Sequence, residues 1–269
     1  MKFLFLGGLA VFGYLLSATL QFTAFRNTEN NNKLRLFAAG SGWLAAAFHL
    51  LYNTKLFLAP EGINFSFFGT ASLIALILTL MLLTASITKP LEKLGIAIFP
   101  MVAALLLLDL TIPLKPHYLS HISWQMNGHI LVSIIAFSLF NIAAFQAILL
   151  ALQDWQLRNH QPIRFMQSLP SLQTMEFLLF QIIGVGLFFL TLSLLSGILF
   201  VNDLFAQHLA HKTVLSITAW IIFGTLLLGR LRYGWRGRTA IKWTLSGFAL
   251  LLLAYFGSKL VLELILQKY

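Results

Sequence analysis

Histidine is the side chain of this sequence that is best suited to metal chemistry. The chain holds seven histidines and no cysteine, so a metal would be bound through imidazole nitrogens and not through thiolates. His49 and His129 fall within long apolar stretches, and His211 comes just before another. Two imidazoles in apolar surroundings suit the axial ligation of a haem iron. The same side chains could instead hold Zn²⁺ or Cu²⁺.

The spacing of the remaining histidines does not decide between these metals. His208 and His211 form a His-x-x-His pair, and His117 and His121 form a His-x-x-x-His pair. Both spacings occur among metal ligands, but neither pair falls clearly on a helix. The ordinary alternative for His117, His121 and His208 is that they are solvated in loops.

Eight apolar stretches must position these residues. The 269 residues are 59% hydrophobic and 10% charged, with a mean hydropathy of +0.86, whereas a soluble domain is about 25% charged. A span needs about 20 apolar residues, and a backbone in lipid must satisfy its own hydrogen bonds. We therefore expect an all-α polytopic membrane protein, a single transmembrane domain over 1–269. The predicted spans are 3–25, 36–58, 65–87, 95–112, 128–153, 177–201, 213–229 and 243–265.

The placement of Lys and Arg predicts the orientation of these spans. Twelve basic residues fall in one set of loops and six on the other side. The positive-inside rule puts the richer set in the cytoplasm, so both termini are expected outside. Six of the seven histidines, all but His160, then share the outer level of the membrane. The net charge of +10 is explained by this asymmetry, and nucleic acid is not an expected partner.

Polar residues within the spans are the next candidates for a site. His129, Ser133 and Asn141 share one face of a helix, since their spacings are close to multiples of 3.6 residues. Asp109 lies near the outer end of its span. Intramembrane ionisable groups usually face a bundle interior or a cavity. The alternative is that these groups hydrogen-bond between helices.

Motifs in the C-terminal half carry a family resemblance. They are Leu169-Pro170-Ser171-Leu172-Gln173, His211-Lys212-Thr213 through Ala219-Trp220, Gly234-Trp235-Arg236-Gly237-Arg238, Gly247-Phe248 and Tyr255-Phe256-Gly257. With them, the sequence resembles the cytochrome c assembly (haem-handling) membrane protein family, in particular its small branch of YpjD-like and HemX-type inner membrane proteins. The resemblance covers roughly residues 125–266. It implies a multi-pass protein of the inner (plasma) membrane of a bacterial-type cell.

The haem platform of the large family members is altered in this chain. Those members carry a Trp-rich outer loop that ends in Trp-Asp-Pro-Lys-Glu and lies between two outer histidines. Lys212 matches the lysine of that motif, but Ala210 and His211 replace the aspartate and the proline, and 202–212 contains no tryptophan. His129 matches the first flanking histidine. The second would fall near Leu266 and is missing.

The resemblance implies a haem-binding or haem-handling inner membrane protein that assists cytochrome c assembly or haem homeostasis. Haem b would be held by His129 with His211 or His49 as the second ligand. The missing tryptophans favour an alternative, a non-catalytic membrane partner or regulator of a metal transporter or haem-synthesis enzyme that has lost the platform. In neither case do we expect an enzyme, because haem attachment needs thiols that this chain lacks. The expected partners are the lipid bilayer, haem and other membrane proteins.

Overall fold

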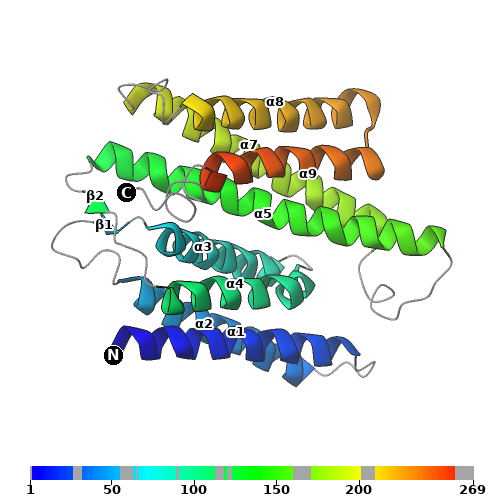
Figure 1. Cartoon of the computed structure of the whole chain (residues 1–269). Coiled ribbons are helices and arrows are strands. Elements are labelled where there is room, and N and C mark those ends of the chain that lie inside the picture. The colour runs from blue at the N-terminus through cyan, green and yellow to red at the C-terminus, as the bar shows by residue number, and fades with distance from the viewer. Residues whose placement is uncertain are drawn as a thin grey trace. The chain divides into compact units, whose positions relative to one another are not determined.

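Helices account for nearly all of the structure, a computed structural model (Figure 1). It describes residues 2–26, 32–54, 63–64, 66–88, 91–112, 118–119, 123–159, 171–200 and 210–257. Within these residues, eight helices are long and apolar enough to cross a membrane. The chain is therefore an all-α polytopic membrane protein, as the sequence predicts. The orientation of the termini stays a prediction.

The helices group into two compact units. Unit 1 comprises Met1–His121 with Ile163–Leu169, and unit 2 comprises Ile122–Pro162 with Pro170–Tyr269. The elements described in unit 1 are α1 (Lys2–Arg26), α2 (Asn32–Asn53), β1 (Ile63–Asn64), α3 (Phe67–Thr88), the 3-10 turn η2 (Glu92–Leu94), α4 (Gly95–Thr111) and β2 (Tyr118–Leu119). Those in unit 2 are α5 (Trp124–Arg158), α7 (Leu172–Phe200), α8 (Ala210–Tyr233), α9 (Arg238–Leu252) and the π turn η3 (Leu253–Gly257). The prediction of one domain over 1–269 stays a prediction.

Small residues bring the helices of unit 1 together. A Cβ on Gly13 of α1 would lie 2.8 Å from Cβ of Ala45 on α2, so α1 and α2 approach closely at this point. α4 also packs against α1, and α3 packs against α2 and α4. The two short strands pair antiparallel, with Ile63 opposite Leu119.

Aromatic stacking holds the middle of unit 2. The rings of Phe140 on α5 and Phe223 on α8 are stacked with centroids 3.9 Å apart, and neither residue is exposed. Gly186 of α7 and Gly247 of α9 lie against these two rings, where a Cβ would come within 3.1 Å and 2.7 Å. The glycines therefore make room for the stacked pair, and the Gly247-Phe248 motif of the sequence falls at this contact.

Several helices extend beyond the predicted spans, whereas α3 begins two residues after its span and α4 begins where its span does. α2 begins at Asn32, four residues before the predicted 36, and α8 runs from Ala210 to Tyr233 where 213–229 is predicted. The additional residues are partly polar, so hydropathy alone ends these two spans too early. Residues 55–58, 65, 201 and 258–265 of the predicted spans lie outside the described residues.

α5 shows the largest such difference. Its 35 residues make a rod of about 52 Å, against about 30 Å of hydrocarbon. Ser123 caps its start by accepting a hydrogen bond from the Met126 amide at 3.3 Å. Near its end, Arg158 Nε bonds Asp154 Oδ2 at 3.1 Å, one turn away, so the helix continues past the predicted residue 153.

The Gly234-Trp235-Arg236-Gly237-Arg238 motif forms the turn between α8 and α9. Gly234 and Gly237 have φ of 65° and 57°, a left-handed conformation that favours glycine. The ring of Trp235 occupies the space beside Gly229. The Gly237 amide donates to Glu176 Oε1 of α7 at 2.6 Å. The motif is thus explained by the geometry of a tight helical hairpin.

Candidate functional site

His129 lies in the second turn of α5 and is half-buried. Its Nδ1 is 2.8 Å from the hydroxyl oxygen of Ser196 on α7. The backbone carbonyl of Ser193, also on α7, is a second hydrogen-bonding neighbour of the ring. The imidazole is thus oriented by α7.

A cluster of hydroxyl groups surrounds the backbone of His129. Ser133 donates to the His129 carbonyl at 2.7 Å, and its hydroxyl lies 2.6 Å from that of Ser193 on α7. Tyr255, in η3, donates to the Ser133 carbonyl at 2.8 Å. The shared face of His129 and Ser133 therefore points to α7, which fits the hydrogen-bonding alternative named above. We call Ser133, Ser193 and Ser196 the serine cluster.

Sequence reasoning missed the α7 half of the serine cluster. Ser193 and Ser196 are three residues apart, which places them on one side of α7. That spacing was a usable signal, because the two serines stand within an otherwise apolar run. The spacing does not indicate, however, that the two serines face α5.

Aromatic side chains lie deeper along the same face of unit 2. The ring centroid of Phe137 is 4.7 Å from that of Tyr255, 5.9 Å from Phe248 and 5.8 Å from Phe256. Phe137 follows His129 by eight residues, which is about 12 Å along α5. The arrangement is a nitrogen donor at the helix end with an apolar aromatic wall beneath it.

His211 lies at the start of α8 and is exposed. Within unit 2, α5 and α8 begin and α7 ends at the same end of the helices (Figure 1). His129 and His211 therefore belong to one end of the unit. No hydrogen bond joins the two imidazoles in the described residues.

His49 has very different surroundings in unit 1. It lies within α2, is 0% exposed, and has both ring nitrogens in hydrogen bonds. Nδ1 is 3.1 Å from the Tyr14 hydroxyl of α1, and Nε2 is 3.0 Å from the Ser72 hydroxyl of α3. Ser72 in turn donates to Asn53 Oδ1 at 3.1 Å. His49 thus ties three helices together, and a metal would have to displace one of these bonds.

Other predicted polar residues also pair between helices. Asp109 of α4 accepts a 2.7 Å hydrogen bond from the Tyr52 hydroxyl of α2. The Trp220 indole of α8 donates to Thr191 Oγ1 of α7 at 2.8 Å. These contacts are of the kind expected between membrane helices.

The donor set of the described residues bears on the kind of metal site that they could form. Among the described residues, no three His, Asp or Glu side chains gather where they could hold a metal ion. A Zn²⁺ site would need three or four such ligands. A single oriented imidazole above an aromatic wall fits one axial position of haem. His117, His121 and His208 lie outside the described residues.

The eight helices that are long and apolar enough to span a membrane place the chain in the class of polytopic membrane proteins. The family described as "Cytochrome C assembly protein" matches residues 37–266. The chain therefore belongs to the cytochrome c assembly protein family, and the resemblance seen in its motifs is confirmed.

Named relatives refine this placement. The chain is similar to the inner membrane protein YpjD of Escherichia coli, with 33% identity over 244 residues, covering 88% of this chain and 90% of that protein. It is also similar to the cytochrome c biogenesis protein CcsA of Trichormus variabilis, with 27% identity over 97 residues, 35% of this chain and 28% of CcsA. With CcsA of Chlamydomonas reinhardtii it shares 27% over 153 residues, 56% of this chain and 41% of that protein. No solved structure matches. The chain is thus a multi-pass inner membrane protein.

Proposed function

We propose that this protein acts in cytochrome c biogenesis as a haem-handling inner membrane protein, with His129 as an axial ligand of haem b. Membership of the cytochrome c assembly family supports the process. The observation that carries the haem proposal is the orientation of the His129 ring by α7, because Nδ1 lies 2.8 Å from the Ser196 hydroxyl in half-buried surroundings.

Ser196 is the residue that would orient this ligand. A hydrogen bond from Nδ1–H to the Ser196 oxygen leaves the lone pair of the neutral ring on Nε2, which is the form that binds metals. Ser196 in turn donates to the Ser193 carbonyl at 2.9 Å, so its own position is fixed by α7. Haem, when bound, supplies an iron that accepts the imidazole nitrogen.

His211 is the better candidate for the second ligand. It lies at the same end of unit 2 as His129, and its ring is exposed. His49, the other candidate, would have to give up its bond to Tyr14 or to Ser72. Breaking a buried hydrogen bond costs about 1–3 kcal/mol for each group that is left unsatisfied.

The visible absorbance spectrum of the detergent-solubilised protein tests the proposal. The wild-type protein should show a reduced haem signal, and His129→Ala should lose it or shift it. His160→Ala, at a position outside the described residues and predicted on the cytoplasmic side, is the matched control and should match the wild type. Full occupancy with an unchanged spectrum in His129→Ala would falsify the assignment.

The second candidate function is that of a non-catalytic membrane partner or regulator, for example of a metal transporter or a haem-synthesis enzyme. The start of α8 favours it, because Ala210 and Lys212 already lie in the helix where the large members carry their platform motif. The absence of tryptophan from 202–212 points the same way. A colourless, metal-free preparation would support this candidate. We propose no enzymatic activity in either case.

A further inference from the structure

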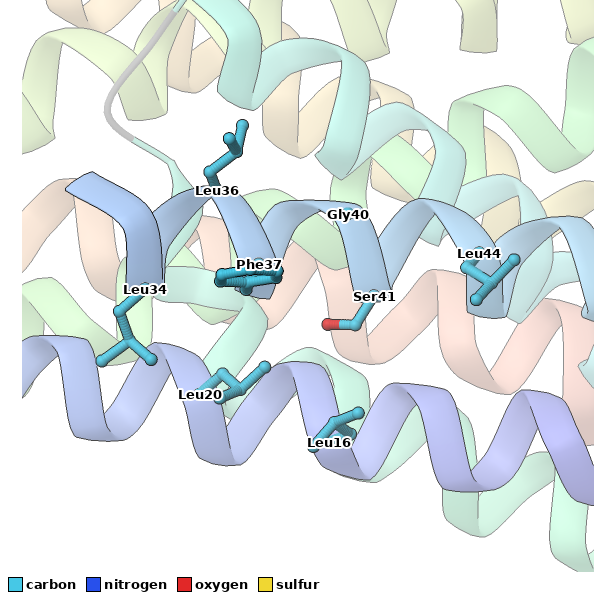
Figure 2. Close-up of a pocket in the computed structure, with 8 residues that line it drawn as sticks. All are labelled: Leu16, Leu20, Leu34, Leu36, Phe37, Gly40, Ser41 and Leu44. Carbon is cyan, nitrogen blue, oxygen red and sulfur yellow. The ribbon is translucent and has the colours of Figure 1, made fainter. Parts of the chain in front are cut away.

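A groove runs along the outside of the α1–α2 pair in unit 1. Its volume is about 460 Å³, and Figure 2 shows how side chains of the two helices line it. The lining includes Leu16 and Leu20 of α1 and Leu34, Phe37, Gly40 and Leu44 of α2. The Ser41 hydroxyl at its wall is already bonded to the Ala38 carbonyl at 2.9 Å. The groove therefore offers apolar contact and no free hydroxyl donor.

The length of the groove along α2 matches the thickness of one membrane leaflet. Leu34 and Leu44 are ten residues apart on α2, which is about 15 Å along the helix, half of the roughly 30 Å of hydrocarbon in a bilayer. Gly40 lies midway, and a Cβ there would meet nothing within 4 Å. The hollow in the middle of the groove thus exists because position 40 carries no side chain.

Positive charge gathers at one end of the groove. Lys33 and Arg35 flank Leu34 and are both exposed. Arg35 reaches Glu92 only at 3.9 Å, with the side chains 52% and 45% exposed, so this pair is weak. Lys33 has no ion pair among the residues the structure describes. An apolar slot that ends beside a lysine with no ion pair among the described residues and an arginine with only a weak one matches a molecule with an anionic head and an apolar tail.

We propose that this groove is a binding site for an anionic phospholipid, with one acyl chain along Gly40 and the phosphate at Lys33 and Arg35. Such a lipid would account both for the length of the groove, which matches one leaflet, and for the basic residues at its end. A second copy of the chain, related by an axis along the membrane normal, would bring the same cations to the same depth and set like charges against each other.

Native mass spectrometry of the full-length protein tests the site. The detergent-solubilised protein is titrated with phosphatidylglycerol or with phosphatidylethanolamine, and bound lipid is counted. We expect the wild type to retain phosphatidylglycerol several-fold better. The double variant Lys33→Gln/Arg35→Gln should lose this preference, and it changes only exposed side chains. Gly40→Leu should lower the retention of both lipids by filling the groove.

Gly8→Leu is the matched control. Gly8 of α1 is also exposed, a Cβ there also meets nothing within 4 Å, and it does not line the groove. This variant should bind lipid as the wild type does. Wild-type retention of phosphatidylglycerol in the charge variant and in Gly40→Leu would overturn the proposal. A change of oligomeric state in Gly40→Leu with lipid binding intact would also overturn it and would identify the groove as an interface between copies.

Discussion

His49 and His129 show two uses of the same side chain in one membrane protein. His49 in unit 1 is fully buried and engages both ring nitrogens, with Tyr14 and Ser72. His129 in unit 2 is half-buried, and its only hydrogen bond to another side chain among the described residues joins Nδ1 to Ser196. Both are histidines in apolar helices, so their sequence contexts look alike. Burial and the number of side-chain partners, which depend on the neighbouring helices, separate the two, and His49 is the one that is fully enclosed between helices.

The largest expected effect is on stability, at His49. His49→Ala would leave the Tyr14 and Ser72 hydroxyls without this partner and open a cavity, at a cost of about 2–4 kcal/mol. The midpoint of thermal unfolding in detergent should fall by about 5–15 °C, while haem per folded molecule stays as in the wild type. Leu50→Ala, at a 53% exposed neighbour, is the control and should shift the midpoint much less. Loss of haem from folded His49→Ala would show that His49 is a haem ligand, and the contrast drawn between His49 and His129 would then be wrong.

A smaller effect is expected at Ser196. Ser196→Ala removes the group that orients His129, and the loss of such a partner typically weakens metal binding about 10–100-fold. Haem titration followed by absorbance measures this change. Ser86→Ala is the control, because the Ser86 hydroxyl only bonds the Leu82 carbonyl of its own helix. Wild-type haem affinity in Ser196→Ala would show that His129 needs no orientation from α7.

The smallest effect is expected at Tyr255. Tyr255→Phe removes the hydrogen bond to the Ser133 carbonyl but keeps the ring that packs on Phe137, so the cost should be about 1 kcal/mol. The thermal midpoint should drop by a few degrees, and the haem spectrum should keep its position. Tyr233→Phe, at a tyrosine that is 75% exposed, should change neither. A shifted spectrum in Tyr255→Phe would extend the site beyond His129 and the serine cluster.

The number of spans could be predicted from the sequence because the bilayer imposes a length of apolar chain. Each of the eight predicted stretches overlaps one described helix. The helix ends were harder to predict from the sequence than the number of spans. In α5, for example, the helix continues beyond the apolar run through Asp154 and Arg158. A hydropathy pattern measures preference for lipid, whereas a helix ends where its hydrogen bonds end.

The candidate site was predictable only in part. His129 could be singled out from its position and from the family resemblance, but its partner Ser196 lies 67 residues away, and Tyr14 lies 35 residues from His49. Such contacts depend on how helices rotate and pair, which periodicity within one helix does not encode. The hydrogen-bonding partners of the polar face on α5 therefore had to come from the structure.

The turn between α8 and α9 has a consequence for how the chain enters the membrane. Only Gly234, Trp235, Arg236 and Gly237 separate the two helices, so neither can settle in lipid far from the other. At about 5–20 residues per second, the ribosome finishes α9 within a few seconds of α8. We therefore expect the pair to leave the translocon as a single hairpin. Because Gly237 bonds Glu176 of α7, the hairpin finds its docking point on a helix that has already been synthesised.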